Sequence, residues 1–347
     1  QEPGVTRASG LLAPSFLSSD LLGTGVRQPM FLTMGNTSDF TFSLIKTSKI
    51  NLLIESQYRK LFDLGDLILE SAFLPSSGNN SIKGFLKIKG NARLDQSAFL
   101  NVDTTLISDT SFLGKYGYDD RDRFLNSISF EKFSNRSSLR ASTLYHTSLR
   151  DSNTVEPLVL PDLRYRKYRK LKKSGLLLSE KYSLVGISRQ EGIGYSRLSA
   201  DLELSKSWQI ENGLIVRGTG NILTAAYSEN NINTERYLLK VYPLGALEFK
   251  YPFFRGRNNK SEVLIPVAQV VYSTDASSPE RPIDEDSSTT EFDSTTLFKL
   301  RKIPGIDRQE NGLRLNAGLQ YFYEYKDNYK YNVNLGQVYR NKNSEDF

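Results

Sequence analysis

The sequence predicts an all-β protein built from long antiparallel strands, and three features of the chain support this prediction. Apolar and polar side chains alternate with a period of two over long stretches, whereas a helical period is hard to find. The chain contains 19 Tyr and 19 Phe although its mean hydropathy is only -0.42. Turn-forming residues, for example at 77–80 and 211–213, separate the alternating stretches.

The clearest strands are predicted at residues 198–210 and 313–325. In the first, one face carries Leu198, Ala200, Leu202, Leu204, Trp208 and Ile210, and the other carries Ser199, Asp201, Glu203, Ser205, Ser207 and Gln209. In the second, the apolar face carries Leu313, Leu315, Ala317, Leu319, Tyr321, Tyr323 and Tyr325. We expect roughly 15 to 18 strands, many of about 10 to 14 residues, against a usual strand length of about 5–6.

Such strands fit either a soluble β-sandwich or a membrane barrel. A sandwich buries its apolar faces in a core, whereas a membrane barrel turns them to lipid and encloses a wet lumen with its polar faces. Strands of about 10 residues can span a bilayer, but the uncharged runs are too short for a membrane helix of about 20 residues. Aromatic residues gather near the expected strand ends, as at a membrane interface. The sequence therefore favours a single domain, residues 1–347, that forms an antiparallel up-and-down transmembrane β-barrel.

The composition leaves little material for catalysis or metal binding. Because the chain has no Cys, disulfides, cysteine–zinc sites and thiol nucleophiles are excluded within it. The single His, His146, would need an activated Ser for hydrolysis, and the chain has no Gly-x-Ser-x-Gly motif. The acidic residues 284–286 lack the spacing of a calcium loop, so we interpret them as part of an exposed loop. We predict no enzyme activity, no catalytic residue, no cofactor and no metal.

A run of basic and aromatic residues covers positions 164–173. Such a run can stack on nucleic-acid bases, pair with lipid phosphates, or simply remain solvated. Plain solvation and lipid phosphates are the favoured interpretations, and nucleic acid is not an expected partner. The candidate contacts for lipid phosphates are Arg164, Arg166, Lys167 and Arg169. The net charge of +6 at pH 7 points weakly in the same direction.

One connection is much longer than the others and covers residues 274–312. Its first part, 275–282, is polar and rich in Pro, and apolar residues such as Leu297 and Phe298 follow. Apolar residues in a long loop predict that the loop packs on another part of the protein. Short turns that alternate with long loops are typical of outer-membrane barrels.

The same connection resembles a motif of the LptD family of lipopolysaccharide-assembly proteins. Residues 292–298, Phe-Asp-Ser-Thr-Thr-Leu-Phe, resemble the family's Phe-Asp-x-Thr-Asn-Leu-Phe, and residues 304–314 hold an intact Pro-Gly-x-Asp-Arg-x-Glu-x-Gly-x-Arg. The chain departs from the family at Ser294, Thr296, Ile303 and Ile306. The motif residues assigned to this loop are Asp293, Pro304, Gly305, Asp307, Arg308, Glu310, Gly312 and Arg314.

Further stretches follow in the family's order. Residues 9–16 resemble its first barrel strand, residues 159–165 a mid-barrel Leu-Pro-x-x-x-Tyr stretch, and residues 336–340 its late Gly-Gln-x-Tyr-Arg. Residues 265–270 resemble its Glu-Pro-x-x-Gln-Leu, with Ile265 in place of Glu. The resemblance covers nearly the whole chain. It implies an incomplete barrel that lacks an upstream periplasmic jellyroll and the last of about 26 strands.

The resemblance also implies a function that the pattern alone does not provide. A barrel of this family is a translocon in the outer membrane of a Gram-negative bacterium. It inserts lipopolysaccharide into the outer leaflet through a wet lumen and a lateral gate between the first and last strands. The implied partners are lipopolysaccharide, outer-membrane lipid, a lipoprotein plug like LptE and a periplasmic bridge protein like LptA. The alternatives are another outer-membrane porin or substrate channel, a lipid hydrolase, and a secreted adhesin.

Two prolines mark the expected lateral gate in the segment 10–32. Pro14 falls in the first predicted strand and Pro29 in the second, and the family resemblance implies prolines beside the seam. Proline donates no backbone hydrogen bond, and an unmade backbone bond is costly in lipid, so we expect these residues to weaken the wall. The alternative is that both prolines merely begin or end strands.

Overall fold

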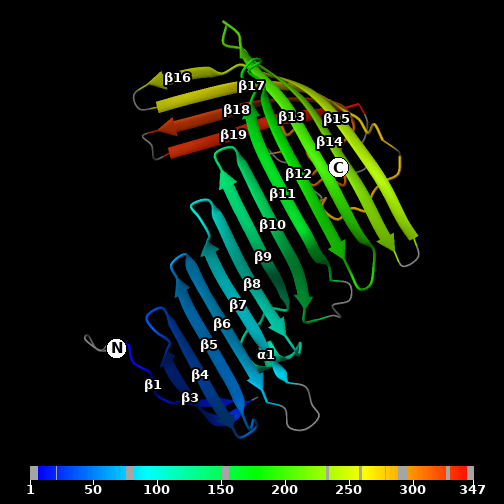
Figure 1. Cartoon of the computed structure of the whole chain (residues 1–347). Helices are drawn as coiled ribbons and strands as arrows, with labels where there is room; N and C mark the ends of the chain where they lie inside the picture. Colours follow the sequence, from blue (N-terminus) through cyan, green and yellow to red (C-terminus); the bar gives the residue numbers. More distant parts are fainter. Residues whose placement is uncertain are drawn as a thin grey trace. The chain divides into compact units, whose positions relative to one another are not determined.

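The computed structural model describes residues 7–20, 22–75, 82–150, 156–231, 234–257, 260–277, 279–287, 296–325 and 329–341. Within these ranges the chain forms nineteen strands and one short helix, α1 (Phe112–Tyr116) (Figure 1). The strands are β1 (Gly10–Leu11), β2 (Ser15–Ser19), β3 (Gly23–Thr33), β4 (Ser38–Thr47), β5 (Leu53–Phe62), β6 (Gly65–Leu74), β7 (Lys83–Arg93), β8 (Ala98–Ile107), β9 (Arg123–Ser134), β10 (Ser137–Ser148), β11 (Leu158–Lys170), β12 (Leu177–Ser188), β13 (Gly194–Gln209), β14 (Ile215–Asn231), β15 (Thr234–Lys250), β16 (Phe253–Arg257), β17 (Lys260–Ser273), β18 (Gly312–Tyr325) and β19 (Tyr329–Arg340).

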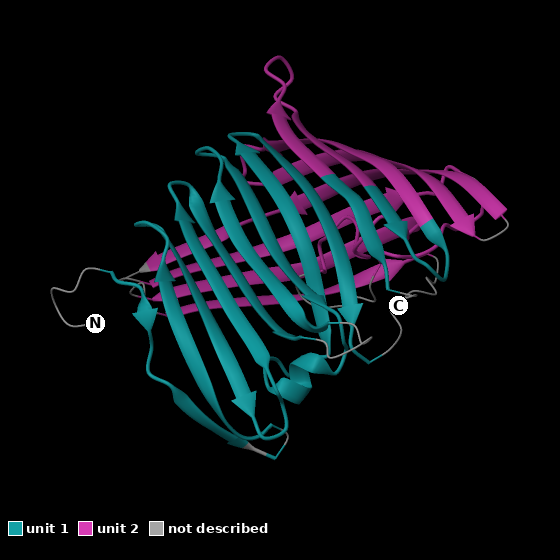
Figure 2. Cartoon of the chain, turned by 60° about the horizontal axis from the view of Figure 1, so that its bottom comes forward, with its two compact units in different colours: residues 1–163, 185–194 teal, residues 164–184, 195–347 magenta. Residues whose placement is uncertain are grey.

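The chain divides into two compact units, which we describe separately (Figure 2). Unit 1 comprises Gln1–Leu163 and Val185–Gly194, and unit 2 comprises Arg164–Leu184 and Tyr195–Phe347. In unit 1 each strand from β3 to β10 pairs antiparallel with the next along the chain. In unit 2 the pairs β14–β15, β17–β18 and β18–β19 are antiparallel as well. The prediction of an all-β, up-and-down, antiparallel fold is therefore confirmed.

Two strands are interrupted by proline. β15 and β16 pair with β17 in one continuous register, because Lys250 lies opposite Val267 and Phe253 opposite Leu264. They are two parts of one strand that is broken at Pro252, which has no N–H for the ladder. β1 and β2 are likewise both partners of β3. Counting each interrupted pair once, the nineteen segments make seventeen strands, as the sequence led us to expect.

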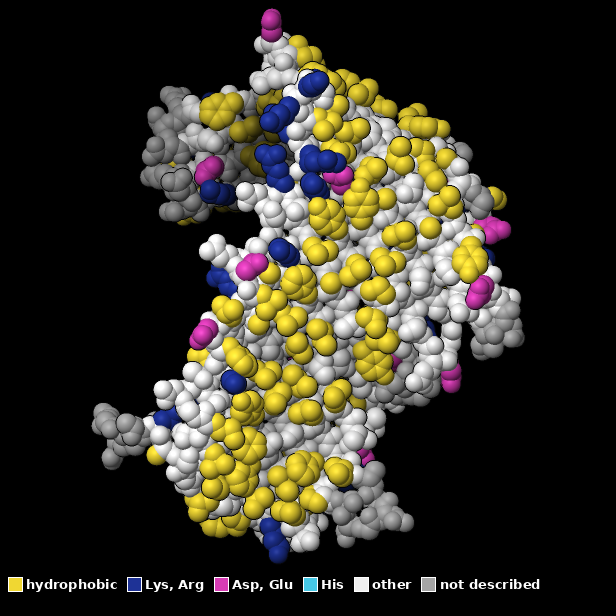
Figure 3. Space-filling model, in the orientation of Figure 1, with side chains coloured by type: hydrophobic (Ala, Val, Ile, Leu, Met, Phe, Trp, Pro, Cys, Tyr) yellow, Lys and Arg dark blue, Asp and Glu magenta, His cyan; other side chains and the backbone are white. Residues whose placement is uncertain are grey.

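The two faces of the strands differ in the way that the alternation predicts. On β13, Leu198 is 59% and Trp208 47% exposed, whereas Arg197 between the apolar positions is only 4% exposed. On β18, Leu315 is 42% exposed and its neighbour Asn316 is fully buried. Hydrophobic side chains accordingly cover much of the strand surface that Figure 3 displays. A soluble sandwich would bury the apolar faces, so this distribution favours strands that turn their apolar side to lipid.

A connection covers part of the other face in unit 1. The connection between β8 and β9 contains α1, whose Phe112 and Leu113 are buried. Phe112 packs with Ile45, Leu53 and Ala72, which come from three neighbouring strands. The alternation of the sequence did not predict this helix, because its five residues are too few to show a helical period. Among the described residues, no helix is both long enough and apolar enough to cross a membrane.

Trp208 is the only Trp in the chain, so its fluorescence reports which face meets lipid. In protein folded into bilayers, we expect brominated lipids to quench Trp208 strongly and iodide in the water to quench it weakly, because its ring lies on the apolar face. The double variant Trp208→Phe/Gln209→Trp moves the indole to the opposite face of the same strand. In this variant we expect weak quenching by brominated lipids and strong quenching by iodide. Equal lipid quenching in both proteins would contradict this orientation of β13.

Candidate functional site

The long connection between β17 and β18 lies against the buried face of unit 2, as its apolar residues led us to expect. Gln269 of β17 donates a hydrogen bond from Nε2 to the carbonyl oxygen of Phe298 at 3.1 Å. Arg314 of β18 donates from Nη2 to the carbonyl oxygen of Leu300 at 2.8 Å, and the Ser273 hydroxyl donates to the carbonyl oxygen of Glu310 at 2.6 Å. Strand side chains thus replace water for the buried backbone of the loop.

Asp307 is the centre of the contacts between this connection and the strands. Its carboxylate accepts hydrogen bonds from Arg197 Nη1 at 2.6 Å and from the Tyr227 hydroxyl at 3.0 Å. The backbone N–H of Glu285 donates to the second carboxylate oxygen at 3.0 Å. The Asp307 side chain is fully buried and that of Arg197 is 5% exposed, so this ion pair lies out of water. A buried charge requires such partners, because an unpaired one costs several kcal/mol (about 3–5).

Asp286 holds the backbone of the motif itself. Its Oδ1 accepts the N–H of Ile306 at 2.9 Å and that of Asp307 at 3.1 Å, while Oδ2 accepts Arg197 Nη1 at 2.5 Å. Gly305 has a φ of +92°, a left-handed conformation that favours glycine. A Cβ at this position would lie 2.6 Å from the Asp286 carbonyl oxygen. The Pro-Gly-x-Asp part of the motif is thus a turn fitted closely around one carboxylate.

Glu310 forms the second ion-pair centre. It pairs with Arg314 on one carboxylate oxygen and with Arg340 of β19 on the other, the latter at 3.0 Å. The backbone N–H of Lys302 donates to Glu310 at 3.2 Å. The Arg314 side chain is 2% exposed, and Gly312, where β18 begins, has a φ of +106°. The Glu-x-Gly-x-Arg part of the motif therefore joins the end of the loop to β18 and β19.

The remaining motif residues differ in their surroundings. Arg308 is half exposed and pairs with Asp284 at 2.6 Å. Pro304 is exposed, and Asp293 lies outside the residues that the structure describes.

An acidic cluster is also present here. One carboxylate oxygen each of Asp284, Asp286 and Asp307 lie within 4.8 Å of one another. Arg197 and Arg308 pair with these carboxylates, so the cluster belongs to an ion-pair network. Residues 284–286 are therefore bound into the loop, whereas the sequence suggested a simply exposed segment.

Sequence reasoning missed the strand residues that complete this site. Arg197 and Tyr227 contact Asp307, and Lys240 of β15 pairs with Asp275 at 2.7 Å although its side chain is only 1% exposed. The available signal was their alternation with exposed apolar neighbours along long strands, such as Leu239 beside Lys240. That signal shows which face they occupy but not which loop covers them.

The proline positions lie in unit 1. The sequence placed Pro14 inside the first strand, but the structure places it in the gap between β1 and β2. Gly10 lies opposite Phe31 and Ser15 opposite Arg27, so the first segment holds one extra residue across this gap. Such an extra residue makes a bulge, which disrupts the ladder locally.

Pro29 lies within β3, and its missing N–H faces β1. The Leu12 N–H donates to the Pro29 carbonyl oxygen at 3.0 Å, and in an antiparallel pair the reciprocal bond would run from residue 29 to Leu12. Proline cannot donate it. The Gln28 side chain donates to the Leu12 carbonyl oxygen instead, at 2.9 Å. A side-chain amide thus replaces a backbone hydrogen bond between the first two strands.

The candidate lipid-phosphate residues lie at the end of β11 in unit 2. Arg164, Arg166 and Arg169 are exposed, and Lys167 is half-buried. Arg169 pairs with Glu180 of β12 at 2.8 Å. The four cations therefore differ in their exposure and in their ion pairing.

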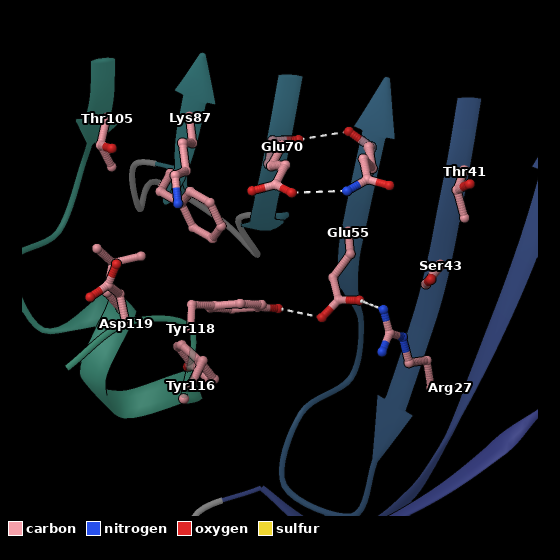
Figure 4. A pocket seen from close by; sticks show the side chains of 16 residues that line it. Arg27, Thr41, Ser43, Glu55, Glu70, Lys87, Thr105, Tyr116, Tyr118 and Asp119 are labelled. Carbon is pink, nitrogen blue, oxygen red and sulfur yellow. Dashed lines mark hydrogen bonds and ion pairs between the residues drawn. The ribbon is translucent and has the colours of Figure 1, made fainter. Parts of the chain in front are cut away.

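Unit 1 also contains a polar pocket of about 530 Å³ between α1 and the strands (Figure 4). Tyr118 donates its hydroxyl to Glu55 at 2.7 Å, and Arg27 pairs with the same carboxylate at 2.6 Å. Burial and this hydrogen bond raise the pKa of Tyr118 above its usual value. Gln57 donates to Glu70 at 2.9 Å. The pocket holds charges of both signs, as expected for a water-facing surface.

His146 of β10 does not form a catalytic arrangement in the described part of the chain. It is half-buried, and no hydrogen bond connects it to a Ser or a carboxylate among the described residues. The nearby Ser142 donates instead to Asp162 at 3.2 Å.

Long antiparallel strands with exposed apolar faces, and a polar face covered by a loop, define the class of outer-membrane β-barrel proteins. The family model of LptD, described as LPS transport system D, matches residues 81–347. The match covers more than half of the chain, which therefore belongs to the LptD family. This family places the protein in the outer membrane of a Gram-negative bacterium.

Individual relatives are distant. The LPS-assembly protein LptD of Pseudoalteromonas atlantica is 23% identical over 353 residues, which cover 96% of this chain and 46% of that protein. LptD of Idiomarina loihiensis is 28% identical over 116 residues, which cover 33% of this chain and 15% of that protein. The chain thus spans about half the length of the first relative. The solved outer-membrane protein OmpT of Vibrio cholerae is 8% identical, with a TM-score of 0.31 and 95% of each chain covered.

The ion pair at Asp307 predicts that Arg197 and Arg308, two arginines of one cluster, contribute very differently to the free energy of unfolding. Arg197→Met should lower the free energy of unfolding by about 3–5 kcal/mol, because it leaves two carboxylates without their buried partner. Arg308→Met is the matched control and should cost less than about 1 kcal/mol, since Arg308 is half exposed. Urea titrations in detergent micelles measure both, and equal losses would contradict the central role of Asp307.

The lowered pKa of Lys302 predicts that the stability of the folded protein depends on pH. Burial, together with Arg314, Arg340 and Lys299, lowers its pKa from 10.5 to about 8, although Glu310 opposes this. The unfolded chain then binds the proton more tightly, so stability should rise between pH 8 and 10.5 by at most about 3 kcal/mol. In Lys302→Met this rise should be absent, and comparing the two proteins removes the contribution of other groups. Parallel stability curves would show that Lys302 titrates normally.

Proposed function

We propose that this chain is the membrane-embedded part of a lipopolysaccharide-assembly protein and that it delivers lipopolysaccharide to the outer leaflet. Membership of the LptD family supports the role in lipopolysaccharide transport at the outer membrane. The load is an acylated and phosphorylated glycolipid, whose sugars need water while its acyl chains need lipid. Strands with one polar and one apolar face supply both environments on either side of a single wall. No covalent bond changes in this process, so it needs no catalytic residue.

The proposed exit is a lateral gate beside the first strands, and one observation carries it. Between β1 and β3, the Gln28 side chain bonds the Leu12 carbonyl oxygen that the Pro29 backbone cannot reach. A side chain can rotate away from its partner without moving the strand, whereas a backbone donor is fixed in the ladder. The gap at Pro14 adds a bulge to the same pairing of the first strand with β3. Both features loosen the hold of β3 on the first strand, so the first strand can move when it separates from the last strand.

The proposed partners follow from the same route. A periplasmic bridge protein like LptA would hand lipopolysaccharide to the protein, and a lipoprotein plug like LptE would fill part of the lumen. The connection 274–311 already covers the inner face of unit 2 through its ion pairs at Asp307 and Glu310. We propose that it narrows the lumen there and keeps the buried charges of the strands paired.

Restoring the backbone donor should tighten the gate. In the full-length protein, Pro29→Ala allows the backbone bond to Leu12, and Pro14→Ala restores a donor at the gap. We expect both variants to slow lipopolysaccharide export, measured as increased sensitivity to large hydrophobic antibiotics and as less lipopolysaccharide at the cell surface. Pro266→Ala in β17 is the matched control, because it restores a donor to a strand far from the seam in the chain, and it should leave export unchanged.

Disulfides distinguish the proposed exit from other routes, since the chain has no native Cys. A crosslink between the first and last strands of the full-length barrel should stop export. A crosslink between β2 and β3, at the facing positions Phe16 and Val26, should not stop it if lipid leaves on the other side of the first strand. If export continues with the first and last strands joined, the lateral gate is refuted.

A further inference from the structure

Unit 2 carries an exposed basic surface at the end of β11, here called the basic end. It comprises the exposed residues Arg164, Arg166, Arg169 and Lys170 in the second half of β11 and Lys172 and Lys173 in the following turn. Arg164, Arg166 and Lys170 alternate with Tyr165 and Arg169 and therefore project from the opposite face of the strand. Figure 3 shows Lys and Arg side chains gathered at the upper end of the strands, beside a mostly hydrophobic surface. The turn that follows β11 is ordered by hydrogen bonds from the N–H groups of Leu171 and Gly175, each 2.8 Å long. The cations are thus presented on a defined hairpin.

Most cations of the basic end lack an acidic partner. Within the described ranges, no ion pair with a carboxylate is formed by Arg166, Lys170, Lys172 or Lys173. Arg169 is held in place by Glu180 at 2.8 Å. Most of the positive charge at this end of unit 2 is therefore available to an anionic ligand.

The carboxylates of unit 2 are not confined to one end of its strands. Asp307 and Glu310 lie at the end opposite the basic end and are paired with arginines, whereas Glu180 lies beside Arg169 and Glu211 lies in the turn 210–214. Arg166, Lys170, Lys172 and Lys173, which form no ion pair with a carboxylate among the described residues, outnumber these two carboxylates, so the basic end attracts an anionic ligand.

Aromatic rings adjoin the basic end on the apolar face. The Tyr165 and Tyr182 rings stack with centroids 6.3 Å apart. Lys206 Nζ lies 5.6 Å from the Trp208 ring centroid, and its side chain reaches the turn at Gly175. Tyr and Trp beside cations are the residues that occupy the head-group region of a bilayer. The basic end therefore lies at the level of lipid head groups when the apolar face meets the acyl chains.

The lengths of the connections between strands indicate which leaflet of the membrane the basic end meets. The turns 171–176 and 210–214 adjoin the basic end, whereas the long connection 274–311 leaves from the opposite end of unit 2. In outer-membrane barrels the periplasmic turns are short and the extracellular loops are long. The basic end accordingly faces the periplasm. The lipid head groups on that side belong to phospholipids, since lipopolysaccharide is delivered to the outer leaflet.

We propose that the basic end binds the phosphate head groups of anionic phospholipids in the periplasmic leaflet and anchors this part of the barrel wall at a fixed depth. The ammonium groups of Lys170, Lys172 and Lys173, at and beyond the last residue of β11, supply charge-assisted hydrogen bonds to the phosphates. The proposal rests on the outer-membrane placement of the proposed function but not on lipopolysaccharide export. It assigns the basic run to a resident lipid, and not to the lipid that is transported.

Energy transfer from the single Trp tests this proposal. The protein is folded into bilayers that contain a trace of phosphatidylglycerol with a pyrene-labelled acyl chain, or phosphatidylcholine with the same label. Because Trp208 adjoins the basic end, transfer to the labelled phosphatidylglycerol should be the stronger, and high salt should weaken the preference. No lipopolysaccharide and no export step enter the measurement, so its failure would leave the proposed function intact.

Matched variants test whether the preference for phosphatidylglycerol depends on the lysines of the basic end. Lys170→Gln/Lys172→Gln should reduce the enrichment of phosphatidylglycerol around Trp208 by about five-fold or more. Lys46→Gln/Lys49→Gln removes two exposed lysines of unit 1 and should change nothing. The proposal is overturned if no preference is seen, or if the preference survives in the first variant. If a soluble poly-glutamate probe then binds the wild type but not that variant, the surface serves an acidic protein instead.

Discussion

The pairing of charges on the inner faces of the strands is the constraint on which the rest of the structure depends. The strands turn many apolar side chains outward, and Arg197, Lys240 and Arg314 lie on the opposite face with less than 6% of each side chain exposed. A buried cation is tolerated only beside an anion with good hydrogen-bond geometry. The connection between β17 and β18 supplies those anions, so the loop and the sheet stabilise each other.

This constraint also explains the chemistry of the loop motif. Asp307 and Glu310 each bind two side chains and one backbone N–H, and Gly305 allows the backbone to pass close to Asp286. The described motif residues thus bind the loop to the strands. Apolar contacts add to these ion pairs, because Leu300 of the connection packs against Leu244, Ala246 and Val271 of the strands.

The seam near the first strands follows the opposite principle. There the backbone ladder is incomplete, and Gln28 completes it with a side chain. Under the proposed function, the backbone pairing of β3 with the first strand can loosen, whereas the ion pairs of unit 2 keep that part of the wall in place. The basic end adds a third element, because lipid anchoring would hold one part of the wall in place while the seam moves.

The sequence by itself determined the strands and their faces, because a period of two in the side chains fixes which residues meet lipid and which do not. It also located the motif loop and the basic run. It did not determine that Asp307 meets Arg197 and Tyr227, which lie 110 and 80 positions away along the chain. Nor did it show that Pro14 lies between two strands or that Gln28 replaces the donor of Pro29. Those contacts depend on strand register and on the path of a long loop, and only the folded chain brings such distant residues within hydrogen-bond distance.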